Sequence, residues 1–270
     1  MELKTKLIEE LTNLILEQVK LYKKSLDKRG RKNIYLYKEI ITIFLTRLET
    51  NLTWNRLSVI YNISKSNINS IFSKWTNYGI FKNAYNNFLK KYKLYINNDE
   101  EYIDSTTILN KYGYVNTTGF NSFESKKHKC NKLSIISSSN GIPLGIKLGL
   151  GNIHDIKLLI DTLPKRTFFK YLYADKGYNS IKLKTRLLIN RKIKLIFPYK
   201  KNQIDKNTIE DKIGLKNRMR VEHVNNFLHL RTFKTPILIV VYDIHNIHLN
   251  QNKILIILLL EVLVRLINQI

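Results

Sequence analysis

The chain has 270 residues, of which 44% are hydrophobic, and this composition excludes a disordered basic tail and allows one large domain or a medium domain with a small appendage. Its 46 Lys and Arg residues outnumber 21 Asp and Glu residues, and the formal net charge of +25 favours a polyanionic partner. Nucleic acid is the first such partner, because Lys and Arg neutralise phosphates, and an anionic membrane surface is the second. The single cysteine, Cys130, excludes a disulfide within the chain and fits an intracellular protein.

The first fifty residues predict two helices. Leucines recur at steps of three and four residues, or multiples of them, across residues 1–26. The opening MELKTKLIEEL carries acids and lacks the basic and then apolar order of a secretory signal peptide. A basic break at residues 27–32 precedes the second predicted helix, residues 35–49.

Residues 53–76 predict two short helices joined by a tight turn. Thr53 can cap the first helix, Asn62 can form the turn, and Ser64 can cap the second helix. This is the pattern of a helix-turn-helix, whose second helix enters the major groove of DNA, although any small helical bundle gives a similar pattern. The side chains expected to face the base edges are Lys65, Ser66, Asn67 and Asn69.

A composition change near residue 98 predicts a second domain. After a helix at residues 80–95, strand and helix patterns alternate, which indicates an α/β sheet with an antiparallel and a parallel part. Asn140-Gly141 predicts a tight hairpin between two β-rich runs. The other expected elements are a strand in EYIDSTT, a helix starting at His154 or Asp155, a strand in FKYLYADKGY, a helix capped by Asn179 or Ser180, a strand in KIKLIFPY, a polar connection at 201–214 and an amphipathic helix at 215–230.

Two acids stand in equivalent local settings. Asp104 and Asp175 each follow an apolar strand and precede a turn. In open α/β sheets, sites lie at the carboxyl ends of strands, so the two acids converge if their strands are neighbours. Convergent carboxylates bind Mg²⁺ through oxygen. The alternatives are that Asp104 caps a turn through Ser105 and Thr106, and that Asp175 serves as a turn residue.

Four segments in order carry a resemblance to a known family. YIDSTT, NGIPLGIKLGLGNIHD, YADKGYNS and RMRVEHVNNFL together resemble the DDE-type transposases of bacterial insertion sequences over residues 100–230. The resemblance implies a catalytic core with an RNase H-like fold. It also implies that Asp104, Asp175 and Glu222 are the catalytic acids and the ligands of two Mg²⁺ or Mn²⁺ ions.

The surroundings of Glu222 follow the family in part. The family's arginine is matched by Arg218, four residues before Glu222, and we expect it to touch phosphate or to orient Glu222. The family's tyrosine and lysine positions hold Leu215 and His229. An alternative for Glu222 is a simple ion pair with Arg218 at the i,i+4 spacing.

The predicted fold class is α/β, an RNase H-like mixed sheet flanked by helices and preceded by an all-helical, helix-turn-helix-like domain. Residues 1–97 would bind DNA, and residues 98–270 would form the catalytic domain, ending in an apolar helix at 254–270. The resemblance implies cut-and-paste transposition by a homodimer acting on double-stranded DNA, with terminal inverted repeats and target DNA as substrates. Further DNA contacts are expected at Lys126, Lys127, Lys129, Lys176, Arg218, Arg220 and Arg231.

Two other functions remain open. Leu215, His229 and the unusual segment 233–253 are compatible with a domesticated or decayed transposase that only binds DNA. A membrane-associated protein anchored by residues 254–270 is the other alternative, although Glu261 and Arg265 within that run favour a packing helix. We expect no membrane partner and a location wherever the host DNA is: the cytoplasm or nucleoid, or a nucleus or viral factory. We do not expect secretion.

Overall fold

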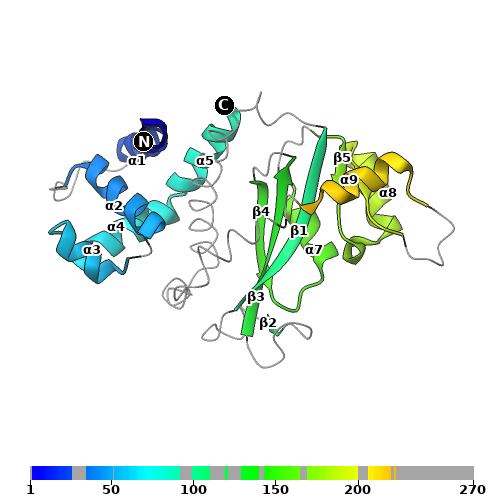
Figure 1. Ribbon diagram of the computed structural model, residues 1–270. Coiled ribbons are helices and arrows are strands. Elements are labelled where there is room, and N and C mark those ends of the chain that lie inside the picture. The colour runs from blue at the N-terminus through cyan, green and yellow to red at the C-terminus, as the bar shows by residue number, and fades with distance from the viewer. Residues whose placement is uncertain are drawn as a thin grey trace. The chain divides into compact units, whose positions relative to one another are not determined.

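The computed structural model describes two compact units, which meet in sequence between residues 91 and 99 (Figure 1). The described residues are 2–25, 35–50, 52–91, 99–109, 119–120, 129–139, 143–164, 169–199, 206–219 and 222. The expected hairpin turn at Asn140-Gly141 and the expected C-terminal helix lie outside them. In the described part of the chain, no helix is long and apolar enough to cross a membrane.

The first unit is helical, as predicted. Its elements are α1 (Glu2–Ser25), α2 (Tyr37–Thr50), α3 (Trp54–Ile60), α4 (Lys65–Asn77) and α5 (Ile80–Lys91). Phe44 of α2 is the centre of an aromatic core, with its ring 5.1 Å from that of Phe72 and 5.5 Å from that of Trp75, both edge-on. Such edge-to-face contacts add to the burial of the rings.

The predicted pair of short helices is confirmed. The Thr53 hydroxyl accepts a hydrogen bond from the Arg56 amide at the start of α3, and the Ser64 hydroxyl accepts one from the Asn67 amide at the start of α4. Asn62 lies between them with a φ of +48°, in the left-handed region that asparagine tolerates in tight turns.

The second unit is built on a mixed sheet. Its strands lie in the order β2-β3-β1-β5-β6, and β4 pairs with β3. β1 pairs antiparallel with β3 and parallel with β5, so β1 joins an antiparallel half to a parallel half. The predicted mixed sheet is therefore confirmed. The strands are β1 (Glu100–Leu109), β2 (Gly119–Phe120), β3 (Lys129–Ser138), β4 (Pro143–Leu150), β5 (Tyr171–Tyr173) and β6 (Lys194–Ile196).

Helices cover both faces of this sheet. Ile103, Leu172 and Leu195 point to one face, where they form the main core with residues of α7 (Asp155–Thr162) and α8 (Ile181–Arg191). Tyr102, Tyr173 and Ile196 point to the other face, because side chains alternate along a strand, and they pack with Leu215 of α9 (Ile209–Asn217).

Two predicted boundaries are wrong. Asp104 does not end its strand, because β1 pairs with β3 as far as Leu109. It therefore does not cap a turn through Ser105 and Thr106, which are strand residues. The predicted polar connection at 201–214 is also wrong in its last part, where α9 already begins at Ile209 behind a capping box formed by Thr208 and Asp211.

Candidate acidic active site

The strand register brings two of the predicted acids side by side. Tyr102 of β1 lies opposite Tyr173 of the neighbouring parallel strand β5. Asp104 and Asp175 are each two residues further along. Asp104 therefore lies on the side of the sheet that faces α9, and Asp175 comes shortly after the end of the neighbouring strand β5. Asp175 stands at the start of the short 3₁₀ helix η1 (Lys176–Tyr178) in extended backbone geometry, and its side chain makes no capping hydrogen bond.

Arg218 links the third predicted acid, Glu222, to Asp104. One guanidinium nitrogen, Nη1, lies 3.6 Å from Asp104 Oδ1, and the other, Nη2, lies 2.7 Å from Glu222 Oε1. The ion pair between Glu222 and Arg218 at the i,i+4 spacing is therefore present. Because the same guanidinium also contacts Asp104, it joins an acid from the sheet to an acid that follows α9.

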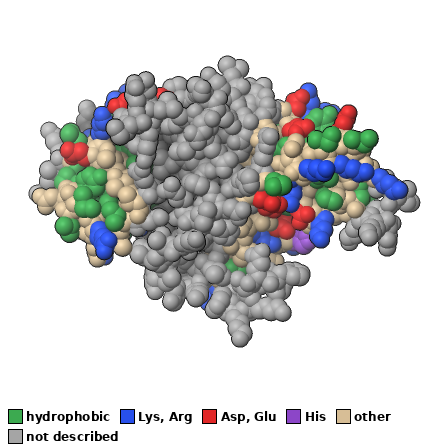
Figure 2. Space-filling model, viewed as in Figure 1, with side chains coloured by type: hydrophobic (Ala, Val, Ile, Leu, Met, Phe, Trp, Pro, Cys, Tyr) green, Lys and Arg blue, Asp and Glu red, His purple; other side chains and the backbone are tan. Residues whose placement is uncertain are grey.

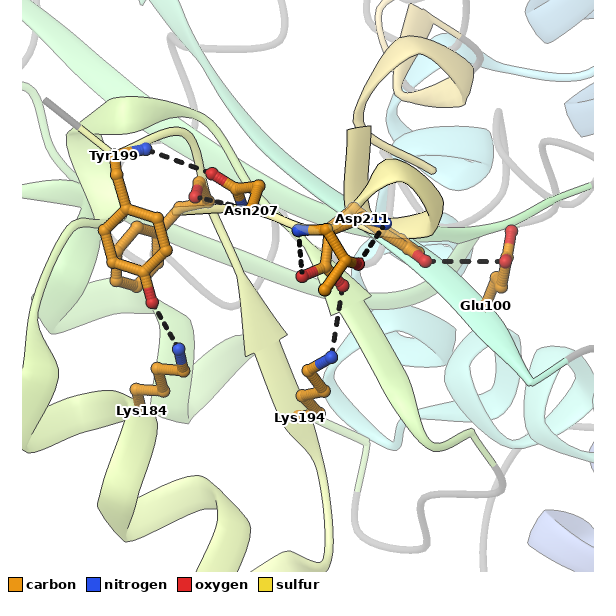
Figure 3. Close-up of polar contacts among 9 residues, drawn as sticks. Glu100, Lys184, Lys194, Tyr199, Asn207 and Asp211 are labelled. Atoms are coloured by element: carbon orange, nitrogen blue, oxygen red, sulfur yellow. Dashed lines mark hydrogen bonds and ion pairs between the residues drawn. The ribbon is translucent and has the colours of Figure 1, made fainter. Parts of the chain in front are cut away.

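Polar contacts at its start hold α9 against the sheet (Figure 3). Thr208 Oγ1 accepts from the Asp211 amide at 3.1 Å, and Asp211 Oδ2 accepts from the Thr208 amide at 3.3 Å. Lys194 of β6 pairs with Asp211 at 3.1 Å. Asn207 donates to the Phe197 carbonyl at 3.1 Å and accepts from the Tyr199 amide at 3.4 Å. Asp211 therefore both caps α9 and pairs with Lys194 of β6. This pairing fixes the start of α9 at the edge of the sheet.

Gly214 allows α9 to lie directly on the tyrosine pair. A Cβ at this position would overlap the ring of Tyr173. The rings of Tyr102 and Tyr173 stack with their centroids 5.6 Å apart, and their hydroxyls donate to the two oxygens of Glu100 at 3.1 and 3.4 Å. Burial, and after it the charge of Glu100, raises the pKa of Tyr173, so this phenol stays neutral and remains a donor. Arg218 follows Gly214 by four residues, about one helical turn. The packing of α9 on the tyrosine pair therefore sets the position of Arg218.

A fourth acid, Asp155, lies on the opposite face of β1. Its Oδ1 accepts a hydrogen bond from Ser105 Oγ at 2.5 Å and pairs with Lys132 Nζ at 3.0 Å. We expected only that Asp155 or His154 would start a helix. His154 is the N-cap of α7, and its ring accepts from the Ile156 amide. The signal that could have identified Asp155 is the GNIHD segment itself, where this acid directly follows the cap.

The predicted DNA contacts are described in part. Lys65, Ser66 and Asn67 are exposed in the first turn of α4, and Asn69 is half-buried. In the second unit, Lys176 is exposed beside Asp175, and Lys129 is half-buried at the start of β3. Lys126, Lys127, Arg220 and Arg231 lie outside the described residues.

The acidic residues fit a hard divalent cation by their chemistry. Mg²⁺ takes one or two protein carboxylates and completes its shell with water and substrate phosphate. Asp104 and Asp175 supply such oxygens at one end of the sheet, and the Arg218 guanidinium shows that a positive group is stabilised between Asp104 and Glu222. Within the described ranges, no three His, Cys, Asp or Glu side chains are close enough together to form a complete metal site.

Comparison with known proteins finds similarity to transposases. Residues 127–233 match the family model described as the DDE domain of transposases, a stretch that includes Asp175 and Glu222. The predicted resemblance to DDE-type transposases is thereby confirmed. No curated protein matches the chain. A cryo-EM structure of a piggyBac transposase synaptic complex with hairpin DNA is similar, with 12% identity over 98% of this chain and 73% of that chain, and a TM-score of 0.47.

Proposed function

We propose that the chain is a DNA transposase that cuts the strands at the ends of a mobile element and transfers the freed 3′-OH into target DNA. The observation that carries the proposal is the joining of Asp104 and Glu222 by Arg218, at the end of the sheet where Asp175 also lies. The match of residues 127–233 to the DDE domain of transposases supports the reaction class.

Asp104, Asp175 and Glu222 are the residues that would hold two Mg²⁺ or Mn²⁺ ions. When bound, such a pair activates the attacking water or 3′-OH and stabilises the leaving oxygen in phosphoryl transfer. The chain's own contribution is position. The sheet fixes Asp104 on β1 and Asp175 just after the neighbouring strand β5, and Arg218 holds the Glu222 carboxylate toward Asp104. Arg218 would also offer a positive charge and hydrogen-bond donors to a phosphate oxygen.

The surface next to Asp175 suits a DNA backbone. From Lys176 to Tyr199 the sequence contains seven Lys or Arg residues and no Asp or Glu. Lys182, Arg186 and Lys192 are exposed along and just after α8. Figure 2 shows Lys and Arg side chains spread over the surface of this unit. A helix of this charge bound along phosphates adds affinity that does not depend on base sequence.

The helical unit would select the element's ends. Its α4 presents Lys65, Ser66 and Asn67 at an exposed helix start, the part of a recognition helix that meets base edges. Because two ends of an element must be cut and joined together, the active form is proposed to be a homodimer bound to two terminal inverted repeats.

The test is strand cleavage and transfer with Mg²⁺ on oligonucleotides that carry the inverted repeats flanking the gene. Asp104→Ala, Asp175→Ala and Glu222→Ala should each abolish cleavage while DNA binding in a gel-shift assay is kept. Glu210→Ala is the matched control, because Glu210 is an exposed acid in the first turn of α9. Wild-type cleavage by the Asp104 and Asp175 variants would reject the proposal.

A DNA-binding protein without cleavage activity is the second candidate. It is favoured by Leu215, which stands at the family's tyrosine position and packs against the tyrosine pair instead of offering a hydroxyl. Specific binding of the repeats by a wild-type chain that never cuts them, with either Mg²⁺ or Mn²⁺, would select this function.

A further inference from the structure

Asp155 connects the segments that carry the two sheet acids. Its Oδ1 accepts from Ser105, which directly follows Asp104 in β1. Its Oδ2 would lie 3.5 Å from a Cβ at Gly177, which is two residues after Asp175. One carboxylate therefore hydrogen-bonds to the strand of Asp104 and lies beside the turn that follows Asp175.

Asp155 approaches β1 from the face opposite to the active site. Neighbouring side chains on a strand point to opposite faces, so Ser105 points away from Asp104 and toward α7. The contact therefore fixes the backbone that bears Asp104 without occupying the space in front of that carboxylate.

Lys132 and the start of α7 hold the Asp155 carboxylate in place. Lys132 Nζ lies 3.0 Å away, and only 15% of the lysine side chain and 26% of the aspartate side chain are exposed. Asp155 is also the first residue of α7, where the free amides of a helix start favour a negative charge. Burial, and after it the charge of Asp155, raises the pKa of the nearby Tyr178 phenol.

We propose that Asp155 is a positioning residue, which sets the separation of the Asp104 and Asp175 carboxylates by holding Ser105 and the Gly177 turn against each other. This inference rests on the proposed function, since it assigns to Asp155 the geometry of the metal-binding pair. Groups that orient metal ligands typically affect metal affinity or activity by about 10–100-fold when they are removed.

The test measures Mn²⁺ binding to the full chain without DNA, by electron paramagnetic resonance of the free ion. Asp155→Asn keeps the shape of the side chain and removes the charge that Lys132 requires. It should weaken Mn²⁺ binding by about 10-fold or more. Cleavage at low metal should fall, and it should recover as Mn²⁺ is raised. DNA binding in a metal-free gel shift should not change.

The chain offers a closely matched control in Asp161. This residue lies on the same helix, is 56% exposed and pairs with Lys147 of β4 at 3.3 Å, away from Ser105 and Gly177. Asp161→Asn should bind Mn²⁺ like the wild type. If Asp155→Asn does the same, the inference is wrong.

Two further outcomes are distinguishable. If the wild type binds Mn²⁺ no more tightly than an Asp104→Ala, Asp175→Ala double variant, the metal site of the proposed function is wrong, and the inference falls with it. If circular dichroism shows that Asp155→Asn is unfolded, Ser105→Ala takes its place, because it removes the hydrogen bond to Asp155 and keeps the carboxylate. Wild-type Mn²⁺ affinity in that variant would overturn the inference.

Discussion

Replacing Gly214 by alanine tests whether close packing of α9 on Tyr173 sets the active site. In an ordinary helix this change stabilises by about 1 kcal/mol, because glycine is a poor helix former. Here the new Cβ would overlap the Tyr173 ring. Carbon atoms pack at about 3.5–4.0 Å, so α9 must move by roughly 1 Å or more.

We expect Gly214→Ala to leave the free energy of unfolding unchanged or lower, whereas helix propensity alone predicts an increase. Overpacking typically costs about 1–3 kcal/mol, which cancels or exceeds the gain in propensity. Since Arg218 follows on the same chain segment and contacts both Asp104 and Glu222, a displacement of about 1 Å should lower strand cleavage on the order of 100-fold.

The measurements are urea unfolding and single-turnover cleavage of repeat-containing DNA. Lys212→Ala is the control, because Lys212 is exposed on the same helix. Reduced cleavage with unchanged DNA binding is expected for Gly214→Ala only. A Gly214→Ala chain that is more stable than the wild type and cuts DNA at the wild-type rate would refute the reasoning.

Two other changes address stability. Burial raises the pKa of Glu101 well above 4.5, and its Oε2 has no hydrogen-bond partner among the described residues. As pH rises above 4.5, the unfolded chain loses a proton that the folded chain keeps, so this residue lowers stability until the folded pKa is passed. Glu101→Gln should therefore be more stable than the wild type at pH 7 and similar to it below pH 4.5 in thermal unfolding; parallel pH profiles for the two proteins would contradict this. Thr208→Ala removes the side-chain half of the capping box of α9 and should cost about 0.5–2 kcal/mol in urea unfolding, whereas an unchanged midpoint would show that the cap contributes nothing.

Local chemistry made most helices predictable. Thr53 and Ser64 each cap the helix predicted for them, and Ser180, one of the two caps predicted for the later helix, caps α8. The capping box of Thr208 and Asp211 carries an equally local signal, but the surrounding polar residues indicated a connection. Helix starts depend on a few neighbouring residues, which explains why they can be found without the tertiary structure.

The end of β1 and the role of Asp155 depend on residues far along the chain. β1 continues past Asp104 because β3 pairs with it, and nothing within EYIDSTT reports that partner. Asp155 contacts Ser105, 50 residues away in sequence. The sequence pattern thus predicted the acids of the candidate site, while the contacts around them required the folded structure.

The mixed sheet also has a consequence for the order in which the protein folds. β3 and β4 follow one another as antiparallel neighbours, and β1 joins them directly. The parallel pairing of β1 with β5 brings together residues as distant as Glu100 and Tyr173, 73 positions apart. Pairings of long sequence separation close larger loops and form late. Asp104 would thus be placed early and Asp175 late, so the two acids would come together only when the parallel half of the sheet has formed.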